Sequence, residues 1–212
     1  MGAVIYLMSN HSSVWKLRER EDHWGWMIGH DGWRTPVRGG DLMPYALDNG
    51  MYFPSDGKPH GHDRLCEFFA RVGKALAFHH PLFAIIPDMP YSAGLTEYRY
   101  TFWNKACREL APLWRWAIAV QDGMTPETLE RLGVGTRGTD AVAVGGSDAF
   151  KKATIPTWAC WCRSRGLWCH VLRVNGPDRL RVCMDEGVDS VDGTGLFPSG
   201  ARAKKRRDVV SA

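Results

Sequence analysis

Acidic, amide and glycine residues stand directly after a series of short apolar runs in this sequence. "AIIP" is followed by Asp88, for example, and "WAIAV" by Gln121. The other residues in equivalent positions are Asp48, the pair Gly145 and Gly146, Arg173 with Asn175 beyond it, and Asp192. If the apolar runs are parallel strands, these residues converge on one pocket at the carboxyl ends of the strands.

The residue types in this set are suited to breaking and remaking a glycosidic bond. Two carboxylates about 5 Å apart can do so with retention. One attacks the anomeric carbon while the other protonates the departing group, and a second nucleophile then resolves the covalent intermediate. A further carboxylate and an amide could read the edge of a heterocyclic base. Each aspartate alone could equally serve a turn or a helix N-cap, as "DNG" and "DGTG" suggest.

The segment "EGVDSVDGTG", residues 186–195, contains two candidate aspartates that are three positions apart. Side chains alternate between the faces of a strand, so Asp189 and Asp192 would point in opposite directions. Asp192 is predicted to enter the pocket at the end of the strand, and Asp189 to face outward or support the strand start. Gly193 and Gly195 would keep the approach to Asp192 free of side chains.

The elements that would position these residues are strands alternating with amphipathic helices. Strands are predicted at 3–8, 24–28, 44–47, 82–87, 116–120, 141–144, 168–174 and 188–191. Helices are predicted at 63–78, 96–113, 125–133, 147–165 and 177–186. This pattern predicts an α/β fold, a compact (β/α)8 TIM-type barrel with irregular first units over 9–23 and 29–43. No glycine-rich phosphate loop follows a strand, which argues against a Rossmann fold.

The sequence predicts one barrel domain over residues 1–200 and a basic tail over 201–212. The chain has 212 residues and a formal charge of +4, and Lys204, Lys205, Arg206 and Arg207 concentrate positive charge in the tail. The tail is interpreted either as a disordered, solvated segment or as a contact for nucleic-acid phosphates. No signal-like start or bilayer-length apolar run is seen, so a cytoplasmic protein without membrane contact is expected.

The six cysteines are expected to be free thiols rather than a disulfide framework. Cys160, Cys162, Cys169 and His170 have a superficially metal-like spacing. If residues 148–164 are helical, however, Cys160 and Cys162 lie roughly 200° apart around the axis, so no metal site is predicted. The histidines of "KPHGHD" and "FHH" are interpreted as loop or surface residues.

At the residues that follow the strands, the chain resembles the tRNA-guanine transglycosylase superfamily. It is most similar to the short DpdA-type 7-deazaguanine DNA transglycosylases of phages and bacteria. The segment "LWCHVLRVNGPDRLRVCMDEGVDSVDGTG" parallels the family's strand, helix start, "G-[IV]-D" and terminal aspartate. "YALDNGMY", "IIPD", "AVQDG" and "VAVGG" parallel four further family motifs, so the resemblance extends over roughly residues 44–195.

The resemblance implies a role for each matching residue. Asp192 would be the nucleophile that displaces guanine from C1′, and Asp48 the general acid and base. The base would be bound by Asp88, Gln121, the backbone of Gly145 and Gly146, stacking on Tyr52, and Leu172 on its opposite face. Arg173 and Asn175 stand where the family has small residues and could contact phosphate or a substituent of the base.

The function implied is a base-exchange pentosyltransferase without a cofactor. It would exchange guanine in DNA for a preQ0-like 7-deazaguanine, giving hypermodified DNA of the kind that evades restriction. The tRNA enzymes carry a zinc site after the nucleophile, but none of the 20 residues after Asp192 is Cys or His, which favours DNA over tRNA. Alternatives are a tRNA-guanine transglycosylase, a non-catalytic nucleic-acid-binding accessory subunit, and a small-molecule N-glycosidase or other barrel hydrolase that uses water as acceptor.

Overall fold

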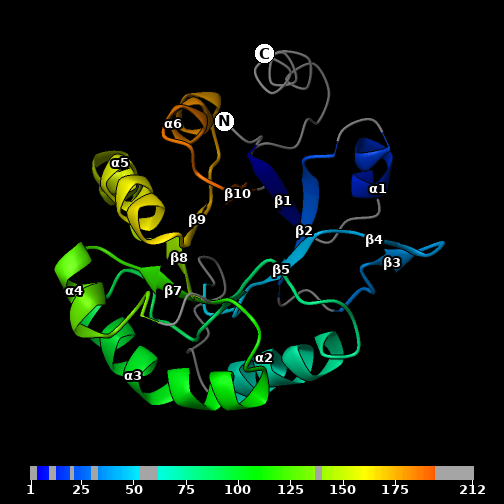
Figure 1. Ribbon diagram of the computed structural model, residues 1–212, viewed down its shortest axis with the longest axis horizontal. Helices are drawn as coiled ribbons and strands as arrows, with labels where there is room; N and C mark the ends of the chain where they lie inside the picture. The colour runs from blue at the N-terminus through cyan, green and yellow to red at the C-terminus, as the bar shows by residue number, and fades with distance from the viewer. Residues whose placement is uncertain are drawn as a thin grey trace.

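The chain forms a closed eight-stranded parallel barrel surrounded by helices, which confirms the predicted (β/α)8 class (Figure 1). The computed structural model describes residues 4–9, 13–19, 22–29, 33–52, 62–136 and 140–193. The barrel strands are β1 (Ile5–Ser9), β2 (Trp24–Ile28), β5 (Tyr45–Leu47), β6 (Ala84–Ile85), β7 (Trp116–Val120), β8 (Asp140–Val144), β9 (Trp168–Val171) and β10 (Ser190–Asp192). They pair in chain order, and β1 closes the barrel by pairing with both β2 and β10.

Helices lie between the strands in the described chain, and the sequence predicted each of them except the short helix over residues 13–18. They are α1 (Ser13–Arg18), α2 (His62–Ala75), α3 (Ala93–Leu110), α4 (Pro126–Arg131), α5 (Asp148–Arg165) and α6 (Pro177–Asp185). The prolines that open α4 and α6 occupy the first turn, where a missing N–H costs nothing. Ser147 caps α5 by accepting a hydrogen bond from the Phe150 N–H at 3.1 Å.

The first two units are irregular, as predicted. Helix α1 has only six residues. The segment between β2 and β5 contains a small antiparallel pair, β3 (Val37–Arg38) and β4 (Asp41–Leu42), which the sequence analysis did not predict.

Strands β6 and β9 are shorter than the apolar runs that contain them. Pro81 and Pro87 flank β6 and lack the N–H that a longer ladder needs.

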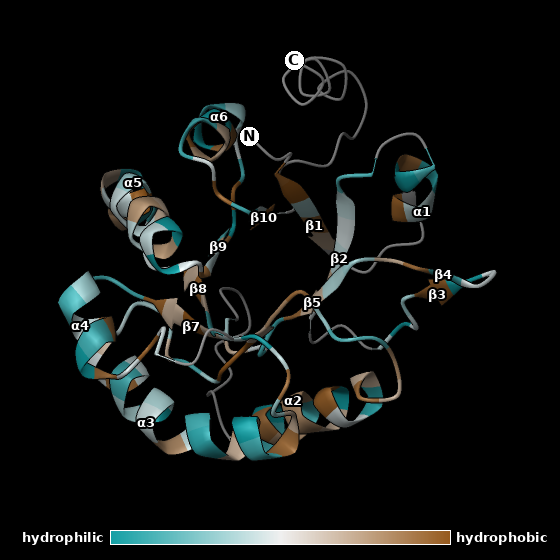
Figure 2. Ribbon diagram, viewed as in Figure 1, coloured by the Kyte–Doolittle hydropathy of each residue, from teal (hydrophilic) through white to brown (hydrophobic). Residues whose placement is uncertain are grey.

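Two apolar clusters follow from the alternation of side chains along the strands. Ala117 and Ala119 of β7 belong to a cluster inside the barrel, whereas Trp116, Ile118 and Val120 pack in the larger cluster toward the helices. Strands β5 and β8 likewise contribute alanines to the inner cluster. In Figure 2 the ring of helices is mixed teal and brown, as expected of helices with one face on the barrel.

Candidate active site

The segments that follow β5 to β9, together with the end of β10, meet at one mouth because all barrel strands are parallel. Asp48, Gln121 and Gly145 directly follow β5, β7 and β8, and Asp192 is the last residue of β10. Asp88 lies three residues beyond the short strand β6. The barrel therefore brings the predicted residues to the same end of the molecule. Lys204, Lys205, Arg206 and Arg207 lie outside the described residues, as does Gly195.

Asp88 is the centre of a buried hydrogen-bond network. Its Oδ1 accepts from Asn49 Nδ2 at 2.7 Å, and its Oδ2 accepts from Gln121 Nε2 at 2.6 Å. The Gln121 Oε1 accepts from the backbone N–H groups of Tyr91 and Gly146, both at 2.9 Å. These two bonds fix the orientation of the Gln121 amide, so its NH2 group must face Asp88.

Burial raises the pKa of Asp88 to about 6, and the nearby charge of Asp48 adds to the rise. The amide donors of Asn49 and Gln121 act in the opposite direction. Each Asp88 oxygen keeps a further lone pair beside its amide donor, and these lone pairs can accept from a ligand N–H.

The glycine pair makes room for this network. A Cβ on Gly145 would lie 2.9 Å from Gln121 Nε2 and 3.1 Å from the Val120 carbonyl oxygen. Gly146 has a φ of 72°, and a Cβ there would crowd Asp122. The backbone N–H groups of the pair donate to Val120 O and Gln121 Oε1. Because both N–H groups are already bonded, the backbone of Gly145 and Gly146 could contact a base only through its carbonyl oxygens. The pair could also influence base binding indirectly, by orienting Gln121.

Asp192 has one carboxylate oxygen held and the other free among the described residues. Its Oδ1 accepts from the backbone N–H of Arg173 at 2.8 Å and lies 3.2 Å from His170 Nε2. Its Oδ2 accepts no hydrogen bond from the residues that the structure describes. The Asp192 side chain is 18% exposed, so Oδ2 is the atom available to a ligand at the mouth.

Arg173 contacts both Asp192 and the aromatic residues Tyr52 and Tyr91. It has a φ of 55°, an uncommon conformation for a residue with a side chain, and this conformation aims its N–H at Asp192. Its guanidinium lies 4.1 Å from the centre of the Tyr52 ring and donates to Gly146 O at 2.7 Å and Tyr91 OH at 2.9 Å. A base stacked on this face of Tyr52 would have to displace the guanidinium.

The remaining predicted side chains of the site are those of Asp48, Leu172 and Asn175. Asp48 accepts at Oδ1 from the Gly50 N–H at 3.2 Å, and its backbone oxygen accepts from Arg71 at 3.2 Å. Leu172 packs on the inner barrel cluster. Asn175 is exposed on the loop after β9. The structure adds a second reason for glycine at position 193, because a Cβ there would lie 2.5 Å from the Val174 carbonyl oxygen.

The sequence predicted neither Asn49, which donates to Asp88, nor His170, which contacts Asp192, as residues of this site. His170 is fully buried, and its ring centre lies 4.8 Å from that of Phe83. The available signal was its position two residues before Leu172, because residues i and i+2 of a strand share a face. In the sequence, His170 stood out only for its metal-like spacing with three cysteines. Cys160 is exposed and Cys162 is buried, so the two lie on different sides of α5, as predicted. Within the described parts of the chain, no cluster of three or more potential ligands could hold a metal ion.

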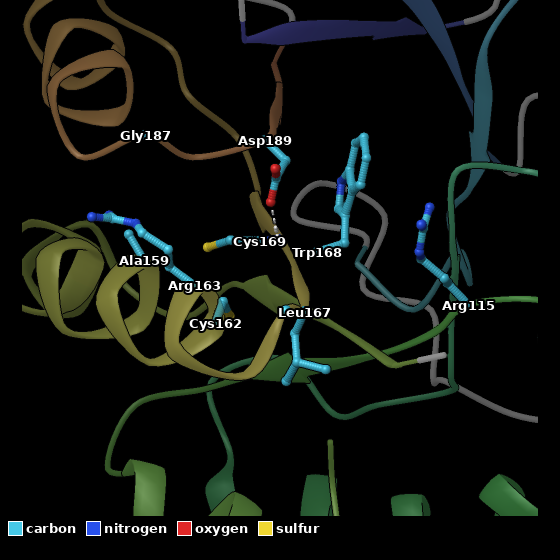
Figure 3. A pocket seen from close by; sticks show the side chains of 10 residues that line it. Arg115, Ala159, Cys162, Arg163, Leu167, Trp168, Cys169, Gly187 and Asp189 are labelled. Carbon is cyan, nitrogen blue, oxygen red and sulfur yellow. Dashed lines mark hydrogen bonds between the residues drawn. The ribbon is translucent and has the colours of Figure 1, made fainter. Parts of the chain in front are cut away.

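Asp189 belongs to the opposite end of the barrel, at the start of β10. Its carboxylate accepts from the Cys169 N–H at 2.7 Å (Figure 3). It lines a cavity of about 280 Å³ together with Arg115, Arg163 and Trp168. This position agrees with the expected supporting role at the strand start and separates Asp189 from the mouth.

No protein-family model matches the chain, and no curated protein matches it. In the part of the chain that the structure describes, none of the helices is long and apolar enough to cross a membrane.

Proposed function

We propose that this protein is a base-exchange transglycosylase that replaces guanine in DNA with a 7-deazaguanine base. The observation that best supports this proposal is the division of labour between two carboxylates at one mouth. Among the described residues, Asp192 has its Oδ1 held by hydrogen bonds and its Oδ2 without one, whereas Asp88 is buried with both oxygens against fixed amide donors. The first arrangement suits a nucleophile and the second suits recognition of base N–H groups.

The reaction would proceed through a covalent intermediate. Oδ2 of Asp192 attacks C1′ of a deoxyguanosine that is flipped out or single-stranded, and the bond between C1′ and N9 breaks. Asp48 gives a proton to the departing guanine and takes one from N9 of the entering base. The nitrogen of the entering base then attacks C1′ and releases the Asp192 carboxylate. Protons and bonds balance over the two steps.

The test is nucleoside analysis of DNA incubated with the purified protein and a labelled preQ0-type base. Wild-type protein is expected to incorporate the label. Asp192→Asn should lower incorporation by at least about 10³-fold, since it removes the nucleophile. Asp185→Asn, an exposed aspartate on α6, is the matched control and should retain wild-type activity.

Trapping tests the intermediate separately. Wild-type protein should form a covalent adduct with DNA when the entering base is withheld, and Asp192→Asn should form none. Full incorporation by Asp192→Asn would refute the nucleophile assignment.

Two further outcomes would favour the alternative functions. Release of free guanine without added base would indicate a hydrolase with water as acceptor. If neither DNA nor tRNA is modified, the accessory-subunit alternative would be favoured.

A further inference from the structure

A chain of polar contacts runs through the barrel interior and ends at Asp192. The indole N–H of Trp168 donates to Ser190 Oγ at 2.8 Å. Ser190 Oγ lies 2.9 Å from His170 Nδ1, and His170 Nε2 lies 3.2 Å from Asp192 Oδ1. Ser190 and His170 are both fully buried. Trp168 and His170 come from β9, whereas Ser190 and Asp192 come from β10, so the register of this strand pair creates the chain.

The hydrogen-bonding capacity of each atom selects one form of the His170 ring. The Trp168 indole can only donate, so it occupies a lone pair of Ser190 Oγ. If the Ser190 hydroxyl then donates to Nδ1, its proton is satisfied and His170 carries its own proton on Nε2, facing the carboxylate. If Nδ1 were protonated instead, the Ser190 proton would lack an acceptor among the described contacts. An unprotonated Nε2 would also face Asp192 Oδ1 with lone pair against lone pair.

We propose that His170 is a positioning residue for Asp192, held by Ser190 as the neutral Nε2–H tautomer. Its N–H and the backbone N–H of Arg173 both donate to Oδ1 of Asp192. The two bonds fix the rotation of the carboxylate, so Oδ2 is the atom presented at the mouth. The catalytic consequence of this arrangement rests on the function proposed above, whereas the tautomer does not.

In that reaction the same two donors would act in both steps. When Oδ2 becomes bonded to C1′, Oδ1 becomes the carbonyl oxygen of the ester. When the entering base displaces the ester, negative charge returns to the carboxylate, and the two N–H groups stabilise it at Oδ1. His170 is therefore expected to affect turnover more than base binding.

The tautomer is tested by 15N NMR of the histidine rings in the full chain at neutral pH, with the His170 signals assigned by their loss in His170→Gln. The expected result is a protonated Nε2 and an unprotonated Nδ1. In Ser190→Ala the preference for this tautomer should weaken, since the donor to Nδ1 is gone. An Nδ1–H tautomer, or a doubly protonated ring, in the wild-type protein would overturn the proposal.

The positioning role is tested by kinetics of base exchange. His170→Phe keeps a ring of similar size but loses the donor, and it should lower kcat by about 10- to 100-fold with KM for the base changed less than about threefold. His170→Gln can place an amide N–H near the position of Nε2 and should recover most of the lost kcat. His80→Gln, at an exposed histidine, is the control for the substitution itself.

The outcomes separate the two proposals. If His170→Phe and His170→Gln are equally impaired while both remain folded, the positioning role is refuted. Wild-type kcat in His170→Phe would also refute it. If the wild-type protein exchanges no base, the proposed function fails, and the NMR result still decides whether Ser190 and Asp192 hold the predicted tautomer.

Discussion

At the scale of single residues, the candidate site depends on two amide side chains, Asn49 and Gln121, whose orientation is fixed by hydrogen bonds. The Asn49 Oδ1 accepts from the Met51 N–H at 2.9 Å, and the Gln121 Oε1 accepts from two backbone N–H groups. Both amides must therefore present their NH2 groups to Asp88. A carboxylate held by fixed donors keeps its remaining lone pairs in a constant direction, which is the property that recognition of a base edge requires.

The raised pKa of Asp88 predicts a pH-dependent stability. Because burial raises this pKa from 3.8 to about 6, the folded protein binds more protons than the unfolded chain between about pH 4 and 6. The contribution to the free energy of unfolding is therefore present below pH 4, falls as the pH rises to 6 and is constant above. Its size is up to ~3 kcal/mol.

Asp88→Asn should remove this part of the slope, as measured by urea unfolding from pH 4 to 8. Asp185→Asn, at an exposed site, should leave the slope unchanged. An identical slope in Asp88→Asn and the wild-type protein would contradict the prediction.

At the scale of elements, α5 holds the loop after β9 in place. Lys151 lies in the first turn of α5 with its side chain fully buried, and its Nζ donates to Leu172 O at 3.0 Å. Its ammonium also lies 3.3 Å from the Asp148 carboxylate and 3.5 Å from Arg173 O. Lys151 of α5 thus stabilises the loop in which the Arg173 N–H points at Asp192.

Lys151→Met should destabilise the protein by about 1–3 kcal/mol, because it removes the buried ammonium that donates to the partly buried Leu172 carbonyl. The adjacent Lys152→Met is the control, since Lys152 is exposed, and it should change the free energy of unfolding by less than about 0.5 kcal/mol. Urea unfolding measures both variants. Equal stability of the two variants would show that Lys151 does not hold the loop.

At the scale of the whole molecule, closure of the barrel requires a close approach between β2 and β5. A Cβ on Gly25 would lie 2.6 Å from the Pro44 carbonyl oxygen and 2.8 Å from Leu7 Cδ2. The nearest of these atoms belongs to the backbone of the segment that begins β5, so a side chain at position 25 would force the strands apart.

Two glycine substitutions should therefore change stability in opposite directions. Gly25→Ala should lower the free energy of unfolding by about 1–3 kcal/mol through overpacking. Gly73→Ala, on the exposed face of α2 with no atom within 4 Å of the added Cβ, should raise it by about 0.5–1 kcal/mol through helix propensity. Thermal and urea unfolding can compare the pair. Stabilisation by Gly25→Ala would contradict the close approach.

The sequence by itself determined the order and type of the elements. Strands 24–28 and 116–120 were predicted with the bounds that the structure has, because strands buried on both faces are continuous apolar runs. The alternation of these runs with helices was enough to predict the barrel, and the residues that follow them were enough to locate its mouth. These signals are local, so a single segment carries them.

Only the tertiary structure decided how the residues at the mouth are paired. The hairpin of β3 and β4 has two residues in each strand, too few for a periodic signal. The contacts of His170 with Ser190 and Asp192 depend on the register of β9 against β10, and the burial of Lys151 depends on the packing of α5 over the loop that follows β9. The partner of a buried polar group is set by strand order and register, which join segments far apart in the chain and leave no periodic trace in either one.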